Sequence, residues 1–280
     1  MRNALKTAVL LGAIGALFLG VGLLLGGEVG LVIGLAIGLL FCGGSYWFSD
    51  TLAIKAARAR PVSREELPQV YEIVEELTRE AGMPMPKMYV SEEMQPNAFA
   101  TGRGPNHAAV CVTQGILRVL DRDELRGVLA HELSHVKNRD ILIGSVAAAV
   151  ALGITFVARI AFWGALFGGG DDNRGNAFGA ILLLILAPIA AGLLQLALSR
   201  SREYQADASG AHLAHDGESL ARALEKIEAY AKQVPMDVSP QQATAYIVNP
   251  LTGRKVEFAN LFSTHPPTAD RIARLRSGQY

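Results

Sequence analysis

Five consecutive residues, His131-Glu132-Leu133-Ser134-His135, combine the side-chain types and the spacing that zinc-dependent hydrolysis needs. In a helix, residues four apart lie on one face, so the two imidazoles can bind one zinc ion from the same side. Bound zinc lowers the pKa of water toward neutrality, and the carboxylate of Glu132 can accept the proton. The segment therefore predicts a zinc hydrolase with Glu132 as its base.

Catalytic zinc usually has three protein ligands, and we expect the third at Glu203. The sequence places His135 just before one long apolar run and Glu203 just after the next. If the helices continue straight out of an antiparallel pair of membrane helices, the two residues stand about 9 Å and about 6 Å above the ends of the apolar runs. Asp207 lies one turn beyond Glu203, where it can accept Nδ1–H from a ligand histidine.

Two alternatives compete with this ligand set. Glu203 could instead be a solvated acid that pairs with Arg200 or Arg202. His212 and His215 form a second metal-like pair, but no acidic third partner is evident for them, so a surface helix is the preferred interpretation.

Four uncharged runs must position these residues. They span Thr7–Gly27, Val29–Ser49, Ile141–Ala158 and Gly175–Ser199. Each is close to the roughly 20 residues that a membrane-spanning helix needs. The first could be read as a signal peptide, but it lacks a convincing cleavage site and continues into the second, so an uncleaved anchor is favoured. Half of the 280 residues are hydrophobic, and 26 basic residues balance 26 acidic ones, which gives no indication of nucleic acid binding.

Basic residues near the ends of these runs set the orientation, because cytoplasmic loops carry an excess of Lys and Arg. They gather before the first run, after the second, before the third and after the fourth: Arg2, Lys6, Lys55, Arg58, Arg60, Arg64, Lys137, Arg139, Arg200 and Arg202. We therefore expect both termini and residues 50–140 to be cytoplasmic.

The remaining segments predict an α+β, mainly helical protein. Ser63–Glu80 has helical spacing, Lys87–Val90, Asn97–Thr101 and Ala108–Thr113 are strand-like, and Asp121 or Asp123 can cap the helix that carries the histidines. The expected organisation is a transmembrane hairpin at 1–50, a first catalytic part at 51–140, a second hairpin at 141–199 and a second catalytic part at 200–280.

Together these motifs resemble the HtpX family of bacterial membrane zinc metallopeptidases, relatives of the CAAX prenyl proteases and the mitochondrial Oma-type peptidases. The resemblance covers essentially the whole chain and rests on four motifs: His131-Glu132-Leu133-Ser134-His135, Glu203-Tyr204-Gln205-Ala206-Asp207, Asn97-Ala98-Phe99-Ala100 and Thr264-His265-Pro266-Pro267 followed by Arg271. It implies a zincin-like cytoplasmic domain with a small, edge-exposed sheet and four transmembrane helices.

The resemblance also implies one Zn²⁺ per chain, held by His131, His135 and Glu203, with Glu132 as general base and acid. It implies a multi-pass protein of the bacterial inner membrane that cleaves misfolded or damaged membrane proteins under stress. The bilayer and unfolded membrane-protein segments are the expected partners. A second copy of the chain and other quality-control proteases remain candidate partners.

Three further assignments follow from the resemblance. Asn97, Ala98 and Phe99 would form the edge strand that pairs with the backbone of the substrate, which suits the free N–H and C=O groups of such an edge. His265 would donate to the oxyanion, although a structural role is equally compatible with its position. Arg271 would orient acidic residues near the metal.

Two other functions compete with an endopeptidase. A CAAX-type prenyl-protein protease would carry additional spans around a large chamber, whereas this chain has four apolar runs. A non-catalytic scaffold or sensor with a structural zinc would not need a carboxylate at position 132, so Glu132 favours catalysis.

Overall fold

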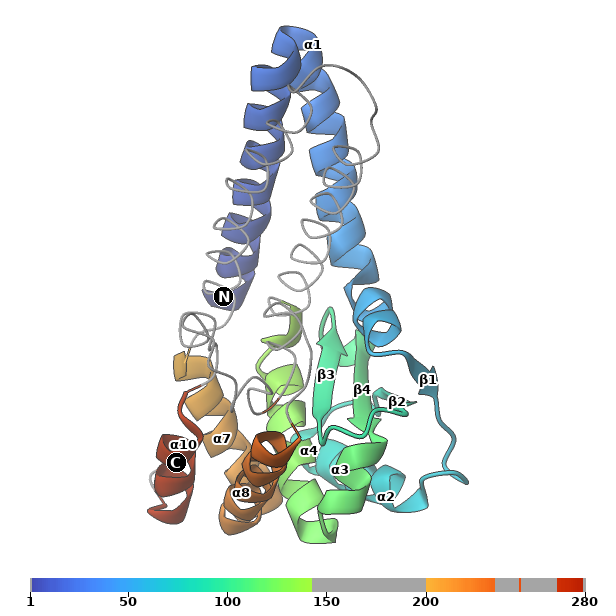
Figure 1. Cartoon of the computed structure of the whole chain (residues 1–280), viewed down its shortest axis with the longest axis vertical. Coiled ribbons are helices and arrows are strands. Elements are labelled where there is room, and N and C mark those ends of the chain that lie inside the picture. Colours follow the sequence, from blue (N-terminus) through green and yellow to red (C-terminus); the bar gives the residue numbers. More distant parts are fainter. Residues whose placement is uncertain (1, 143–199, 235–246, 248–265, 279–280) are drawn as a thin grey trace.

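The computed structural model describes residues 2–142, 200–234, 247 and 266–278, and Figure 1 shows a long helical hairpin standing on a domain of helices and one sheet. The elements are α1 (Arg2–Ala56), β1 (Ala59–Pro61), α2 (Pro68–Ala81), β2 (Lys87–Ser91), β3 (Ala98–Gly102), η1 (Pro105–His107), β4 (Ala108–Thr113), α3 (Gln114–Val119), α4 (Arg122–Lys137), α7 (Arg200–Ala214), α8 (Glu218–Gln233) and α10 (Thr268–Arg276). The coarse prediction of a mainly helical protein with a small sheet is confirmed.

Helix α1 folds back on itself near Gly27, whose φ of +57° is accessible to glycine without a side-chain clash. The two arms contact each other: the rings of Phe18 and Phe41 are 5.3 Å apart, and the Cys42 thiol donates to the Leu11 carbonyl. Within the part of the chain that the structure describes, one segment, Gly27–Phe48, is long and apolar enough to cross a membrane. The third and fourth apolar runs fall almost wholly outside the described residues, so the four-span arrangement stays a prediction.

The sheet has the order β1-β2-β4-β3 and is mixed, because β2 and β4 run parallel while the two outer pairs are antiparallel. The three predicted strands are present within one residue or so of their expected bounds. The additional strand β1 has only three residues, too few for a recognisable alternation of apolar and polar positions. One outer position belongs to β3, as an edge strand requires.

Helix α2 begins at Pro68, not at Ser63 as the helical spacing predicted. Proline has no N–H to donate and is preorganised for the first helical position. It also disfavours the helical conformation in the residue before it, and Leu67 has φ −130° and ψ 63°. The expected end is confirmed, since Gly82 caps the helix in a left-handed conformation.

Helix α4 carries the two histidines and starts at the predicted cap. The Asp121 carboxylate accepts the Glu124 N–H, and the Glu124 carboxylate accepts the Asp121 N–H. The helix ends at Lys137, and Arg139 takes a positive φ of 58°. The assumption that α4 continues straight into the apolar run was therefore wrong, because the chain turns between the histidines and Ile141.

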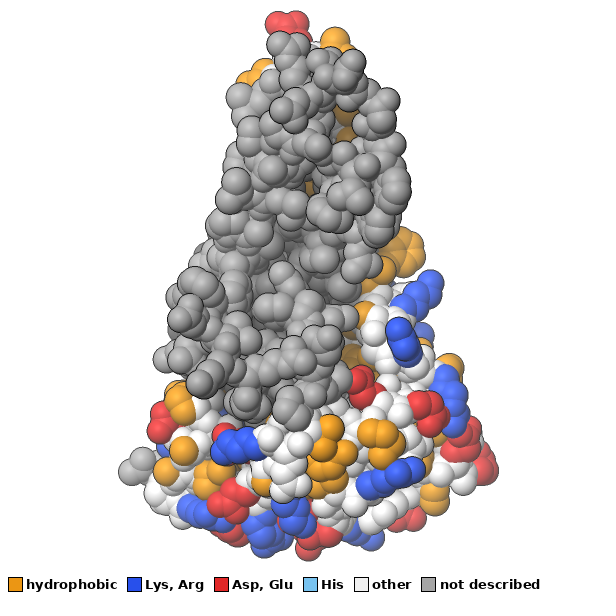
Figure 2. Space-filling model, viewed as in Figure 1, with side chains coloured by type: hydrophobic (Ala, Val, Ile, Leu, Met, Phe, Trp, Pro, Cys, Tyr) orange, Lys and Arg blue, Asp and Glu red, His pale blue; other side chains and the backbone are white. Residues whose placement is uncertain are grey.

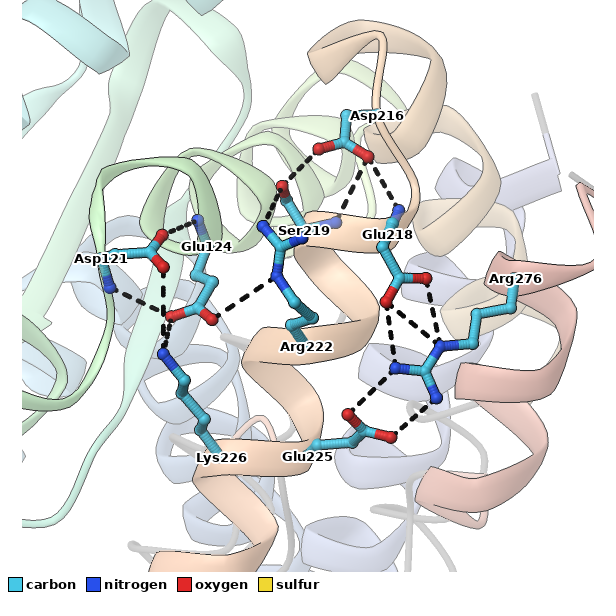
Figure 3. Close-up of polar contacts among 9 residues, drawn as sticks. All are labelled: Asp121, Glu124, Asp216, Glu218, Ser219, Arg222, Glu225, Lys226 and Arg276. Carbon is cyan, nitrogen blue, oxygen red and sulfur yellow. Dashed lines mark hydrogen bonds and ion pairs between the residues drawn. The ribbon is translucent and has the colours of Figure 1, made fainter.

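Charged side chains connect helix α8 to α4 on one side and to α10 on the other, as Figure 3 shows. Lys226 of α8 donates to the buried Glu124 of α4 at 2.7 Å. The guanidinium of Arg276 on α10 binds the carboxylates of Glu218 and Glu225 on α8. Helix α8 thus joins α4 to α10, which carries Arg271.

Candidate metal centre

Two elements far apart in the sequence bring three metal-binding side chains together. His131 and His135 lie one turn apart on α4, and Glu203 lies on the adjacent α7. Their ligand atoms are all within 4.8 Å of one another. The Glu203 carboxylate is 3.7 Å from Nε2 of His131 and 3.5 Å from Nε2 of His135. Ligand atoms in a tetrahedron about 2.1 Å from zinc would be about 3.4 Å apart, so the two distances from the carboxylate to the imidazoles are close to those around this metal.

The close approach of α7 to α4 depends on Gly210. A Cβ at this position would lie 2.9 Å from both Cα and N of His131, which is shorter than real Cβ contacts. Glu203, Asp207 and Gly210 follow the i, i+4, i+7 spacing of one helix face. The face that offers the third ligand therefore also contains the glycine that allows the contact. Gly210 was not predicted from the sequence, although its spacing from Glu203 and Asp207 places it on the same helix face.

His131 continues into a chain of buried polar contacts. Its Nδ1 lies 3.0 Å from the Asp207 carboxylate, which in turn receives two hydrogen bonds from Arg271 at 2.9 and 2.7 Å. Burial alone would raise the pKa of Asp207, but the charge of Arg271 and the hydrogen bonds from His131 and Arg271 hold it well below its usual range. Asp207 is thus a carboxylate that can orient the His131 ring so that Nε2 faces Glu203.

His135 has a carboxylate partner of its own, which the sequence interpretation missed. Nδ1 of His135 lies 3.5 Å from Oδ2 of the buried Asp140, and the Asp140 N–H bonds to the His135 carbonyl. The positive φ of Arg139 turns Asp140 back toward the helix. Burial lowers the pKa of His135, but the hydrogen bond with Asp140 and the charges of Glu203, Glu132 and Asp140 outweigh it and raise the pKa to about 9 in the metal-free protein. The sequence signal for this contact was an acid, Asp140, just after the helix that carries the two histidines.

Glu132 lies between the metal cluster and the edge strand. Its Oε2 accepts the backbone N–H of Ala100 at 2.9 Å. This N–H therefore points away from β4, and the two-residue alternation of an antiparallel pair gives Ala98 the same orientation. The outward backbone groups of β3 thus lie beside the carboxylate of Glu132.

Asn97 and Phe99 do not direct their side chains to that edge. The Asn97 side chain is buried and accepts the Ile247 N–H at 3.1 Å, while the Ile247 carbonyl accepts from Arg271. Phe99 packs near Ile54, on the face of the sheet opposite to the side chains of Ala98 and Ala100. His265 lies outside the described residues.

These features define a class before any relative is considered: a metallopeptidase with a His-Glu-x-x-His helix, a glutamate from a second helix and an adjacent edge strand. The chain belongs to peptidase family M48, whose family model matches residues 64–279. It is accordingly a membrane-associated, zinc-dependent metalloprotease, a hydrolase of peptide bonds.

Named relatives resemble the chain along nearly its whole length. A "Protease HtpX homolog" of Syntrophobacter fumaroxidans is 53% identical and the match covers 99% of this chain and 100% of the relative. Proteins of the same name from Pelotomaculum thermopropionicum and Pyrococcus abyssi are 48% and 50% identical, with 98% and 97% of this chain covered and 99% and 94% of each relative.

A solved structure has a similar fold. The crystal structure of S. mikatae Ste24p matches with a TM-score of 0.53 and 20% sequence identity over 98% of this chain. The match spans 65% of the Ste24p chain. At this identity the likeness concerns the fold alone.

Proposed function

We propose that one zinc ion is held by His131, His135 and Glu203, and that Glu132 is the general base of an endopeptidase. The observation that carries this assignment is the convergence of the three ligand atoms within 4.8 Å beside a buried Glu132. Asp207 and Asp140 orient the two imidazoles, and Arg271 holds Asp207 in place.

The substrate lies extended along β3, antiparallel to it, and exchanges backbone hydrogen bonds with Ala98 and Ala100. Glu132 releases the Ala100 N–H when it turns to the attacking water, which frees that donor for the substrate. Backbone pairing of this kind recognises no particular side chain of the substrate, so the protease should accept a broad range of substrate sequences. The contact between Glu132 and the Ala100 N–H supports the arrangement, because it sets the base beside the strand that would hold the scissile bond. Asn97 acts indirectly: its side chain holds the backbone of Ile247 next to the start of β3.

Bound zinc would supply the Lewis acidity that lowers the pKa of water and polarises the scissile carbonyl. Glu132 accepts a proton from the attacking water and transfers it to the amide nitrogen as the C–N bond breaks. The second proton of the water leaves the new carboxyl group and also passes to the amine, so the products are a carboxylate and an ammonium group and atoms and protons balance. His265 donates to the oxyanion in this scheme, as the family resemblance implies.

The proposed substrates are misfolded membrane proteins with unpaired cytoplasmic segments, cleaved under stress at the inner membrane of a bacterial cell. The division into hairpins at 1–50 and 141–199 and catalytic parts at 51–140 and 200–280 belongs to this proposal, with both termini cytoplasmic. The fold-back of α1 supports it, because its first arm begins on the side of the catalytic domain (Figure 1). Cysteines introduced at Ser63 and Ser277 should resist impermeant thiol reagents in intact cells, and labelling at Ser63 would overturn the orientation.

The catalytic assignment is tested with Glu132→Gln. The amide cannot accept a proton from water, so cleavage of an unfolded model substrate should be lost while zinc content and far-ultraviolet circular dichroism stay unchanged. Asp123→Asn, an exposed change on the same helix, is the matched control and should remain active. Activity of the glutamine variant within tenfold of the unaltered protein would remove Glu132 from this role.

A further inference from the structure

The turn between β3 and β4 contacts the end of the apolar segment of α1. The guanidinium carbon of Arg103 lies 4.3 Å from the centre of the Trp47 ring. Trp47 is 60% exposed, and so is its neighbour Phe48. The buried Nε of Arg103 has no hydrogen-bond partner among the described residues. Stacking on the indole orients the guanidinium plane, and its terminal N–H groups, not the buried Nε, are the donors that a ligand would bind.

This pair lies at the level where the surface changes character. The candidate span ends at Phe48, and exposed Lys55 and Arg58 follow it. In Figure 2, hydrophobic side chains at the lower end of α1 lie directly above Lys and Arg side chains. Tryptophan is enriched at the level of lipid headgroups, and basic residues beside a span attract anionic lipids. The nearest acid along the helix, Asp50, has its Oδ1 bound by the N–H and hydroxyl of Thr51.

We propose that Arg103 and Trp47 form a binding site for the phosphate of an anionic phospholipid in the membrane that α1 crosses. The guanidinium offers paired N–H groups in the geometry that phosphate oxygens accept, while the indole lies against the glycerol and upper acyl region. Lys55 and Arg58 add positive charge beyond the same end of the span. The occupant is a lipid because the site is continuous with the apolar surface of Gly27–Phe48.

The site would fix the membrane end of the edge strand. Arg103 immediately follows Gly102, the last residue of β3. The turn is tight: a Cβ on Gly102 would overlap the His107 carbonyl oxygen, and its φ is +126°. A headgroup bound to Arg103 therefore holds the turn and β3 at a defined distance from the bilayer, which limits the depth at which an extended substrate can pair.

Tryptophan quenching by brominated lipids tests the site directly. The chain has two tryptophans, so Trp163→Phe leaves Trp47 as the only tryptophan, which can be excited without exciting tyrosine. The full-length protein is reconstituted in phosphatidylcholine vesicles that contain increasing fractions of brominated phosphatidylglycerol or brominated phosphatidylcholine. At equal mole fraction, the anionic lipid should quench Trp47 more strongly, because no choline cation offsets the charge of its phosphate.

Arg103→Gln should reduce this preference about fivefold, the effect expected for one basic residue at an anionic surface. Arg103→Lys should keep part of it, because the charge remains without the planar fork. Arg118→Gln, on the exposed side of α3, is the matched control and should keep the full preference. The ratio between the two lipids cancels any direct effect of Arg103 on the emission of Trp47.

Equal quenching by the two lipids, or a preference that Arg103→Gln leaves unchanged, would overturn the proposal. Absence of quenching by either lipid would also overturn it, because Trp47 would then lie away from the bilayer. The measurement needs neither zinc nor proteolysis. A failure of the proposed catalytic assignment therefore remains distinguishable from a failure of the lipid site.

Discussion

Gly210→Ala should weaken zinc binding although Gly210 is not a ligand. The added Cβ would lie 2.9 Å from the Cα and N atoms of His131, whereas ordinary contact begins at 3.4 Å. The difference between these distances requires α7 and α4 to separate by about 0.5 Å, since backbone atoms of a helix cannot turn aside. Glu203 is on the same helix two turns earlier and would move with it.

The magnitude follows from two comparisons. Alanine gains up to about 1 kcal/mol of helix propensity over glycine, but overpacking costs about 1–3 kcal/mol, so the thermal midpoint should fall. Distances between zinc and its ligands tolerate changes of about 0.2 Å, which is less than the required displacement. We therefore expect the zinc dissociation constant to rise at least about tenfold, the lower end of the range for disturbed ligand orientation.

The assay is competition for zinc with a chromophoric chelator, together with thermal unfolding of the metal-free protein in detergent. Gly43→Ala is the control, because no atom lies within 4 Å of a Cβ at that position. An unchanged zinc affinity in Gly210→Ala, with an unchanged or higher thermal midpoint, would refute the reasoning about the helix contact.

Three other results are expected. Arg271→Met leaves the Asp207 carboxylate buried without its guanidinium, so the metal-free protein should lose about 3–5 kcal/mol of stability. The double variant Arg271→Met with Asp207→Asn should recover stability, because the buried charge is then gone; no recovery would contradict this cause. Asp140→Ala should weaken zinc binding about 10- to 100-fold, whereas the control Asp123→Asn should leave it unchanged. Equal zinc affinity in the two variants would exclude Asp140 from orienting a ligand. Because the pKa of His135 is raised to about 9 in the metal-free protein, protons compete with zinc below that pH; affinity should increase from pH 6 to pH 9, and a flat profile would argue against a protonated site.

Much of the fold was predictable because its signals are local. The spacing of two histidines on one helix, the cap at Asp121 and the three main strands depend on short-range geometry, and each is present in the structure. The helix start at Pro68 was misjudged, although the restriction that proline places on the preceding residue was visible in the sequence.

The site itself depended on tertiary structure. Glu203 could be named beforehand by its position after an apolar run, but the straight helix assumed for that argument is interrupted at Arg139. The same interruption turns Asp140 toward His135; the acid after the metal helix was visible in the sequence, but the positive φ of Arg139 that directs it was not. Arg271 reaches Asp207 because α10 packs on both α8 and α7. Periodicity is set by bonds between neighbouring residues, whereas the meeting of distant side chains is decided by how closely whole helices pack.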